Sequence, residues 1–546
     1  MTYAIVAVVA VFVCIFTYGW DVIRPSSLAL YHQWGDGMQH YFGWVAFRQS
    51  RWDFPIGCFD GATYPDATSI IFTDSLPIVA VIFKLFRGWI PHDFQYFGIW
   101  ALLCYILQGV LALKLLLRFL KEPFSRDADE ELSASCLATA VFGAILFLFV
   151  PSLVIRQFAH EALGGQWILL LAWDVFLDIA AKEQKKKICF KSALLGFLAA
   201  GTHIYFLPLC GMILVGALCL NLVVSAVSIL VYLLTAVFTV WIFGGFSVAA
   251  EVVNVDFTFG NNANLNTLIN PLTYSAFFGG LPLTHQGQDD GSGYLGLGIF
   301  VILLLDGIIF AIRRAKGEDK TFDKERGRRL IGALGLILIM TMAFSTYPFL
   351  SVNGRVILST KLTGPMDALM SVFRCNGRGI WVISYGVMIF GAGLLLRQRN
   401  LFKKLLPGLL CLCLLLQVAD LSPLLTEKQK KVHPEDIEVS RYLYAEELNA
   451  LIQSGEVSHV VLTESVSGIP SLFVSCWAID NGLTVNRFYL ARSDEEAYAK
   501  RTKEALDSPQ PDTLYLFAAE AADEMEGYGL SPVLKTDGFA VGRRLP

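Results

Sequence analysis

Runs of about 20 residues with few or no charges recur along the first 420 positions of the chain. A helix of this length crosses the roughly 30 Å hydrocarbon core of a bilayer. The 546 residues are 55% hydrophobic and only 16% charged, whereas a soluble protein is about 25% charged. Water cannot solvate so much apolar surface. We therefore predict an all-α polytopic transmembrane helical bundle of about ten spans.

Most of the predicted spans follow directly from the apolar runs. Single spans are predicted at 3–20, 94–118, 134–152, 163–181, 294–312, 330–348, 380–397 and 402–419. The almost uncharged stretch 190–245 has room for three short spans. The segment Ser75–Phe86 is apolar but short, so we predict that it is partial or re-entrant. Met1–Gly19 lacks a basic n-region and a cleavage site, which predicts a retained helix rather than a signal peptide.

Basic residues set the predicted orientation, because they accumulate on cytoplasmic loops. Four basic clusters can be cytoplasmic together: Lys114, Arg118, Lys121 and Arg126; Lys182, Lys185, Lys186, Lys187 and Lys191; the run Arg313–Arg329; and Arg397, Arg399, Lys403 and Lys404. The loops outside are then 21–93, 153–162, 246–293 and 349–379, with everything after Ala419. We expect a multi-pass protein of the inner or plasma membrane whose C-terminal domain is extracytoplasmic.

The C-terminal part, 421–546, differs in pattern from the predicted transmembrane domain, 1–420. Short apolar runs predict strands, and amphipathic charged stretches predict helices. The strands are His459–Thr463, Leu483–Leu490 and Thr513–Phe517, and the helices are Glu435–Gln453 and Asp494–Leu506. A small α/β soluble domain is therefore predicted. The net charge is only −4 and no basic run is interleaved with aromatic residues, so nucleic acid is excluded as a partner.

The first outer loop, within 21–93, is rich in aromatic residues and carboxylates. Its centre reads TrpGlyAspGlyMetGlnHisTyrPhe, with Asp36 at the start of a segment of helical apolar spacing and His40 one turn later. We predict that this helix lies flat in the membrane interface. Asp36 either caps the helix or is a general base that takes a proton from an acceptor hydroxyl. Asp74, in ThrAspSerLeuPro at 73–77, is another candidate, although it or Ser75 is expected to cap a helix that begins near Pro77.

His160 and Glu161 directly follow the third predicted span on the outer side. Ionisable groups at membrane depth are costly and tend to mark function, but at a helix end they can simply meet water. If functional, this pair orients substrate or acts as a second acid or base. Metal binding together with Asp36 stays open, since sequence spacing cannot show it; no cofactor is certain and a divalent cation is possible. His203 lies in an apolar run and is interpreted as a packed, hydrogen-bonded histidine.

Arg374 and Arg378 stand on the outer side just before a span, in PheArgCysAsnGlyArgGlyIleTrp. A guanidinium grips phosphate with two parallel hydrogen bonds, and does so best where water is scarce. The alternative is an interfacial arginine that snorkels to lipid headgroups. Basic residues are the minority on the outer loops, which favours phosphate binding. The loop 289–298, which contains Tyr294, is either a flexible lid or a plain turn.

With these residues, the chain resembles the GT-C superfamily, polytopic glycosyltransferases that use polyprenyl-phosphate-linked sugars, and more closely a bacterial branch of it. The resemblance covers roughly 1–420. It rests on the acidic residue of the first outer loop, matched by Asp36, and on ThrAspSerLeuPro at 73–77, TyrLeuGlyLeuGly at 294–298 and GlyArgGlyIleTrp at 377–381. The loop has one clear Asp rather than an acidic pair, which puts a metal-dependent variant in doubt.

The resemblance implies an inverting transfer of a sugar from a polyprenyl-phosphate donor to an envelope glycan, lipid or protein. Asp36 would deprotonate the acceptor, and Arg374 or Arg378 would hold the lipid phosphate as it leaves. The residues expected to bind substrate are His40, Asp74, His160, Glu161, Arg374, Arg378 and Tyr294. Two other classes stay open: a transporter or flippase of lipid-linked sugars, which predicts charges near mid-membrane, and a non-catalytic envelope scaffold.

Overall fold

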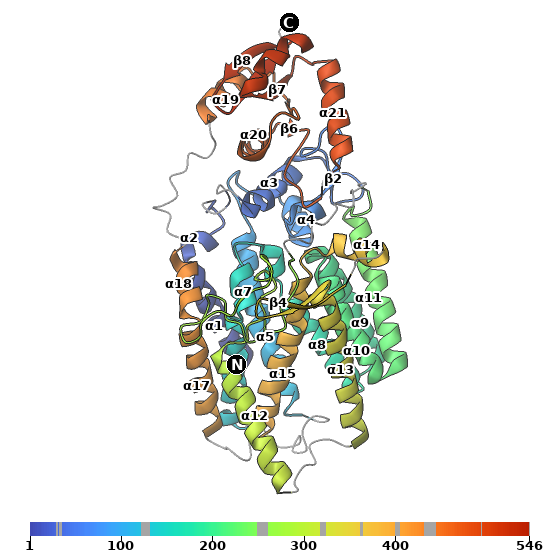
Figure 1. Cartoon of the computed structure of the whole chain (residues 1–546), viewed down its shortest axis with the longest axis vertical. Coiled ribbons are helices and arrows are strands. Elements are labelled where there is room, and N and C mark those ends of the chain that lie inside the picture. Colours follow the sequence, from blue (N-terminus) through green and yellow to red (C-terminus); the bar gives the residue numbers. More distant parts are fainter. Residues whose placement is uncertain are drawn as a thin grey trace.

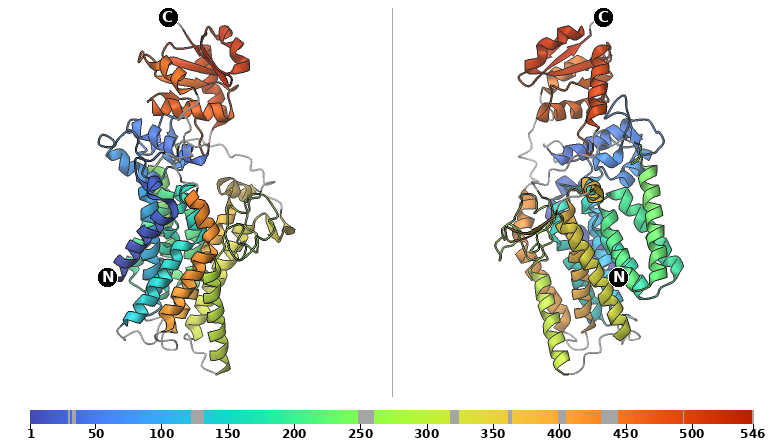
Figure 2. Two further views of the ribbon diagram at one scale, coloured as in Figure 1. Left: turned by 90° about the vertical axis from the view of Figure 1, so that its left-hand side faces the viewer. Right: turned by 45° about the vertical axis from the view of Figure 1, so that its right-hand side comes forward.

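A computed structural model gives the fold of the chain. It describes all residues except 29–30, 32–34, 122–131, 248–259, 317–323, 361–363, 399–404, 431–443, 493 and 545–546. A helical bundle forms one end of the molecule and a small sheet with its helices forms the other, while the first outer loop lies between them (Figures 1 and 2). The polypeptide therefore has the two predicted kinds of structure, a bundle and an α/β unit.

The bundle is built from helices that follow the predicted apolar runs. They are α1 (Thr2–Tyr18), α5 (Phe97–Arg118), α6 (Ala134–Leu146), α7 (Pro151–Arg156), α8 (Trp167–Ala180), α9 (Lys185–Thr202), α10 (Phe206–Gly216), α11 (Leu222–Ile242), α12 (Leu297–Ala315), α13 (Lys324–Thr346), α15 (Trp381–Arg397), α17 (Leu405–Asp420) and α18 (Ser422–Lys430). Three helices, α9 to α11, occupy the stretch 190–245, where three short spans are predicted, and of these only α11 is long and apolar enough to cross a membrane. The predicted span 402–419 begins outside the described residues.

Within the described part of the chain, five helices are long and apolar enough to cross a membrane. They are Phe97–Arg118, Glu161–Ala180, Leu222–Ile242, Glu325–Thr346 and Asn376–Arg397. The bent pair Leu405–Asp420 and Ser422–Lys430, with a bend of 53°, would make a sixth, and Thr2–Tyr18, Ala134–Phe149 and Phe206–Cys219 are shorter apolar helices. The total of about ten spans stays a prediction.

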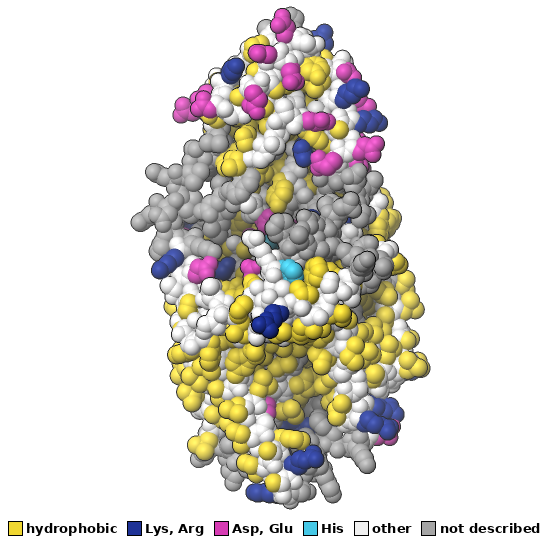
Figure 3. All heavy atoms as spheres, viewed as in Figure 1, with side chains coloured by type: hydrophobic (Ala, Val, Ile, Leu, Met, Phe, Trp, Pro, Cys, Tyr) yellow, Lys and Arg dark blue, Asp and Glu magenta, His cyan; other side chains and the backbone are white. Residues whose placement is uncertain are grey.

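The outer surface of the bundle is apolar. Figure 3 shows a broad belt of hydrophobic side chains around the bundle and charged side chains gathered on the C-terminal part. On α11 the exposed residues include Leu222, Val223, Leu230, Leu233, Leu234, Val237 and Phe238. Exposing apolar surface to water costs a free energy of about 25 cal/mol per Å², so this surface is suited to contact with lipid.

The first outer loop folds into several short elements between the bundle and the C-terminal part. They are α2 (Trp20–Ile23), α3 (Asp36–Gln49), the antiparallel pair β1 (Cys58–Phe59) and β2 (Thr68–Ser69), η1 (Ile70–Thr73) and α4 (Pro77–Leu85). At nine residues α4 is too short to cross about 30 Å of hydrocarbon. The segment Ser75–Phe86 is thus a short helix, in line with the prediction of a partial element.

Helix α3 differs from its predicted environment. Its apolar side chains, such as Met38, Tyr41, Phe42 and Val45, are fully buried instead of facing lipid. The reason is that α4 and η1 pack against it, as does a helix of the C-terminal part, α20 (Gly468–Asp480), so protein covers the helix where a membrane interface was expected. The start of the helix at Asp36 is as predicted.

Other outer loops carry a hairpin and short helices close to the same level. They are η2 (Phe147–Phe149), η3 (Glu161–Gly164), the antiparallel pair β3 (Phe349–Val352) and β4 (Arg355–Ser359), α14 (Gly364–Val372) and η6 (Asn376–Ile380), whereas η4 (Ala217–Cys219) is a separate short turn that connects α10 and α11. Most of these elements connect two bundle helices and lie near the first outer loop.

The C-terminal part is a five-stranded sheet with helices. The strand order is β6-β5-β7-β9-β8, in which β5 runs parallel to β6 and β7, and β9 runs antiparallel to β7 and β8. The elements are α19 (Ala445–Ile452), β5 (His459–Leu462), α20, β6 (Thr484–Val485), α21 (Glu495–Asp507), β7 (Thr513–Ala518), η8 (Ala519–Tyr528), β8 (Ser531–Lys535) and β9 (Phe539–Arg543). The strand predicted at 483–490 is only two residues long, and positions 435–443 of the predicted helix 435–453 lie outside the described residues.

Backbone hydrogen bonds join the C-terminal part to the first outer loop. Tyr64 N–H donates to the carbonyl of Val485 at 2.8 Å, and Val485 N–H donates to the carbonyl of Gly61 at 3.0 Å. Further along, Ala491 N–H donates to the carbonyl of Phe72 at 2.7 Å. The segment after β6 is therefore held against the loop that contains Asp36.

Candidate functional site

Asp36 begins α3 at the boundary between the bundle and the C-terminal part. The preceding residue, Gly35, has a backbone φ of +127°, which residues other than glycine rarely adopt. The Asp36 carboxylate makes no capping bond to the helix. Instead, Oδ2 lies 3.3 Å from His160 Nε2, and Oδ1 accepts a hydrogen bond of 3.2 Å from the Tyr489 hydroxyl. Asp36 keeps 37% of its side chain exposed, so it remains accessible.

His160 holds one oxygen of Asp36. Burial, followed by the nearby charges of Arg156 and Arg378, lowers the pKa of His160 to about 2, so the imidazole is neutral. Nε2 lies 3.3 Å from Oδ2 of Asp36, and a neutral ring that carries its proton on Nε2 can donate to this carboxylate. His160 is thus placed to orient Asp36 without adding a positive charge beside it.

Behind this pair, His40 and Glu161 form a fully buried contact. Nδ1 of His40 lies 2.5 Å from Oε2 of Glu161, and both side chains are at most 1% exposed. Burial lowers the pKa of His40, but Glu161 and the more distant Asp74 and Asp36 outweigh it, so the pKa is raised. Nε2 of His40 has no hydrogen-bond partner among the described residues. The His40 and His160 rings are 6.1 Å apart, which makes the two pairs neighbours.

Asp74 pairs with His203 rather than with a helix end. Its Oδ1 lies 3.4 Å from Nε2 of His203, which was interpreted as a packed, hydrogen-bonded histidine. Helix α4 begins after Leu76, whose φ is +57°, and no side chain caps it, so the capping prediction for Asp74 or Ser75 is wrong. The Ser75 hydroxyl donates instead to the carbonyl of His40 at 2.6 Å. This bond ties ThrAspSerLeuPro to α3.

Arg378 is engaged by a carboxylate that sequence analysis did not single out. Its Nε and Nη2 donate to Asp290 at 2.7 and 3.1 Å, while Arg156 Nη2 reaches Asp290 Oδ1 at 2.7 Å. Burial raises the pKa of Asp290, but Arg378 and Arg156 outweigh it and hold that pKa well below its usual range. A Cβ on Gly291 would lie 2.4 Å from the backbone of Gly377, so only glycine lets these two loops approach closely enough.

Arg374 is exposed. Its Nη2 donates to the carbonyl of Ala491 at 3.0 Å. Burial and the Asp36 carboxylate raise the pKa of Tyr489 to about 12, while Arg374 acts in the opposite direction. Tyr489 is therefore within electrostatic range of both Asp36 and Arg374.

Tyr294 is not part of this group. Its hydroxyl donates to Oδ2 of Asp420 at 2.8 Å, and the same oxygen accepts the backbone N–H of Leu297 at 2.9 Å. The tyrosine is buried. These bonds anchor the end of the loop 289–298 to α17.

A cavity of about 550 Å³ opens onto Asp36. Its other walls belong to the C-terminal part: small and polar residues along α20, and the segment that carries Tyr489. The residues that line the cavity include Asp36, Ser467, Ser471, Ser475, Arg487 and Tyr489. Such a volume accommodates a small ligand. Among the residues that the structure describes, no group of three or more His, Cys, Asp or Glu is arranged to hold a metal ion.

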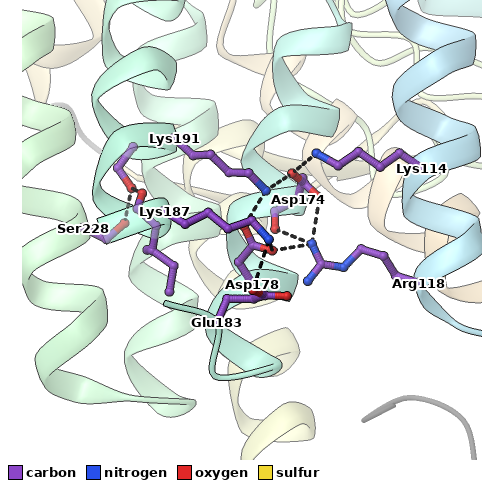
Figure 4. A network of polar contacts seen from close by, with 10 residues as sticks. Lys114, Arg118, Asp174, Asp178, Glu183, Lys187, Lys191 and Ser228 are labelled. Carbon is purple, nitrogen blue, oxygen red and sulfur yellow. Dashed lines mark hydrogen bonds and ion pairs between the residues drawn. The ribbon is translucent and has the colours of Figure 1, made fainter. Parts of the chain in front are cut away.

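A second charged cluster lies at the far end of α8 from Glu161 (Figure 4). Asp174 and Asp178 are fully buried and one helical turn apart. Lys114 contacts Asp174 at 2.7 Å, and Arg118 contacts Asp174 at 2.8 Å and Asp178 at 2.5 Å. Lys191 contacts both carboxylates. The basic residues predicted to be cytoplasmic thus neutralise two carboxylates of a predicted span, which is a structural role.

The comparisons with known proteins cover both parts of the chain. A family model described as "Domain of unknown function (DUF6311)" matches residues 7–422, and one described as "DUF6311 C-terminal domain" matches 448–543. No curated protein matches. Among solved structures, the archaeal oligosaccharyltransferase AglB from Archaeoglobus fulgidus, in complex with an inhibitory peptide and a dolichol-phosphate, is similar with a TM-score of 0.44 and 13% identity, over 96% of this chain and 70% of that one.

Proposed function

The chain belongs to the family described as "Domain of unknown function (DUF6311)", and we propose that it is a GT-C-like membrane glycosyltransferase. It would move a sugar from a polyprenyl-phosphate donor to an envelope glycan, lipid or protein on the extracytoplasmic face. The observation that carries the proposal is Asp36: a partly exposed carboxylate, oriented by a neutral histidine, at the mouth of a cavity of about 550 Å³.

The position of this cavity suits a donor with a lipid tail. Helix α3, which begins at Asp36, lies between the bundle with its apolar belt and the charged C-terminal part (Figures 1 and 3). A polyprenyl chain can stay in hydrocarbon while its sugar phosphate reaches the level of Asp36. An acceptor that is soluble or attached to the envelope can approach from the aqueous side, where the cavity is lined by serines of α20.

The reaction would be a single displacement that inverts the anomeric carbon. Asp36 takes the proton of the acceptor hydroxyl, and the acceptor oxygen forms the new bond to the anomeric carbon. The bond from that carbon to the phosphate oxygen breaks, and its electron pair leaves with the polyprenyl phosphate. Arg374 stabilises the phosphate as its charge grows.

The remaining residues position these groups. Arg378 already binds Asp290 through two nitrogens, so its role is to orient the loop beside the site rather than to receive the phosphate. His160 fixes the carboxylate of Asp36. His40 and Glu161 support His160 from behind, and Asp74 with His203 supports the other side.

The test uses purified protein in lipid nanodiscs with a radiolabelled polyprenyl-phosphate sugar and an envelope extract. Asp36→Asn keeps the shape but removes the base, so the transfer rate should fall about 10²- to 10⁴-fold. Asp21→Asn is the matched control, because Asp21 is an exposed carboxylate of the same loop whose contact with Arg24 is 3.9 Å. Transfer at the wild-type rate by Asp36→Asn would overturn the assignment of the base.

One observation favours a second function, transport of lipid-linked sugars. Asp306 lies in the middle of α12, and its buried Oδ2 has no hydrogen-bond partner among the described residues. Carboxyl groups at such depth often belong to transport pathways. In proteoliposomes, movement of the unmodified donor across the bilayer that is lost in Asp306→Asn but kept in Asp36→Asn would support transport over transfer.

A further inference from the structure

Two arginines from different parts of the chain are held next to each other near Tyr489, whose hydroxyl donates to Asp36. Arg374 follows α14, and Arg492 lies in the C-terminal part just before α21. Arg374 donates to the carbonyl of Ala491 at 3.0 Å, and Arg492 donates to the carbonyl of Ser371 at 2.9 Å. Each guanidinium thus binds the backbone segment that carries the other, which keeps the two cations in close proximity.

These two arginines differ from the others around the site. Arg156 and Arg378 share Asp290, Arg487 pairs with Glu495 at 3.0 Å, and Arg501 pairs with Asp66 at 2.7 Å. Arg374 and Arg492 have no carboxylate partner within the described part of the chain. Burial, and then the charge of Arg374, lowers the pKa of Arg492, as expected for like charges held together without a counter-ion.

The pair lies beside the proposed reaction centre. Tyr489, which binds Asp36, is three residues before Arg492, and Ala491 binds the backbone of Phe72, two residues before Asp74. Arg492 also lines a cavity of about 300 Å³ between the first outer loop and α21. Arg487 and Arg501 on its lining pair with Glu495 and Asp66, whereas Arg492 makes no such ion pair within the described residues.

We propose that Arg374 and Arg492 together bind the phosphate of the donor, so that the C-terminal domain completes the donor site. This inference rests on the proposed glycosyl transfer. In each guanidinium one nitrogen donates to a backbone carbonyl, and the other N–H groups can donate to phosphate oxygens. A phosphodiester donor has one negative charge, whereas the released phosphate monoester has nearly two. Two arginines match the released phosphate better than the intact donor, and this difference lowers the barrier to transfer.

The test measures binding rather than transfer. Full-length protein in detergent is titrated with a short-chain prenyl phosphate and, separately, with inorganic phosphate. Arg492→Gln and Arg374→Gln should each weaken the affinity for prenyl phosphate by about tenfold or more, as expected for loss of one charge-assisted contact. Arg543→Gln is the matched control, because Arg543 is in the same domain, donates to the carbonyl of Pro511 and contacts Glu456 at 3.1 Å on the domain surface.

The outcomes separate this inference from the proposed function. Asp36→Asn should lose transfer, whereas its affinity for prenyl phosphate should not fall, because the substitution removes a negative charge rather than a positive one. If Arg492→Gln and Arg374→Gln both bind prenyl phosphate as tightly as Arg543→Gln, the arginine pair is not the phosphate site, although transfer by Asp36 would still stand. Inorganic phosphate that binds the pair as tightly as prenyl phosphate would overturn the donor assignment in favour of a soluble phosphate. Arg492→Lys, which keeps the charge, should retain binding better than Arg492→Gln, and equal unfolding midpoints establish that the variants are folded.

Discussion

The carboxylate of Asp290 compensates two buried arginines, and its removal provides a direct test of the site's electrostatics. Arg156 and Arg378 are each only 7% exposed, and together they donate to both oxygens of Asp290. Asp290→Asn would leave two positive charges in a poorly solvated place with one neutral acceptor. Breaking a buried ion pair in this way costs about 3–5 kcal/mol. Since whole domains are stable by about 5–15 kcal/mol, we expect a clearly lower unfolding midpoint.

The pH dependence of this effect follows from the pKa of Asp290. Burial alone would raise that pKa, but Arg378 and Arg156 hold it well below the usual value of about 4. A carboxyl group whose pKa is lower in the folded state stabilises the fold above its unfolded pKa, and this stability is lost as the pH falls towards the folded value. The difference between wild type and Asp290→Asn should therefore be full near pH 7 and should shrink below about pH 4.

The assay is thermal unfolding of the purified protein in detergent, followed by tryptophan fluorescence. Asp289→Asn is the matched control, because it removes the neighbouring carboxylate, which is exposed. The double variant Asp290→Asn with Arg156→Gln restores the original net charge of the group and should recover part of the loss. An unfolding midpoint of Asp290→Asn equal to that of Asp289→Asn would refute the reasoning.

Two further predictions concern groups around α3. Burial lowers the pKa of His40, but Glu161, with Asp74 and Asp36, outweighs burial and raises it. Wild type should therefore lose stability as the pH rises above about 6.5, and this loss should be smaller or absent in Glu161→Gln when thermal unfolding is followed from low to high pH. In Gly43→Ala the new Cβ would lie 2.4 Å from Cβ of Thr73, so overpacking should destabilise the protein by about 1–3 kcal/mol. Gly88→Ala, whose Cβ would meet nothing within 4 Å, serves as its control, and equal denaturation midpoints of the two variants would contradict the close packing.

The positions of the helices could be predicted because they depend on local composition. The span predicted at 94–118 is α5, Phe97–Arg118, and the one at 380–397 is α15, Trp381–Arg397. An apolar run of this length is helical whatever its neighbours are, since its backbone groups must bond internally in lipid. What covers a helix is a different matter. The spacing of apolar residues predicted that α3 has an apolar face. The same spacing does not tell whether that face packs against a membrane interface or against α20, which is more than 400 positions away in the chain.

The candidate site was only partly predictable for the same reason. Asp36, His160 and Arg374 stand on outer loops with charges that needed an explanation, so the sequence pointed to them. Their partners did not stand out. Asp290 lies in a glycine-rich turn, and nothing in the sequence distinguishes this turn from an ordinary connection. Tyr489 is 453 positions from Asp36 in the chain. No local pattern encodes a hydrogen bond of that sequence separation, because it depends on how the two domains dock.

The arrangement of charges also gives a direction to the proposed chemistry. Within the described residues, Asp290 is neutralised by two arginines, whereas Asp36 lies beside a neutral His160 and keeps its negative charge. Arg374 and Arg492 have no carboxylate partner in the same part of the chain. During transfer Asp36 gains a proton and loses its charge, while the phosphate gains one. Negative charge therefore moves from the Asp36 side to the phosphate side, and an arginine pair located there favours that movement and opposes its reversal.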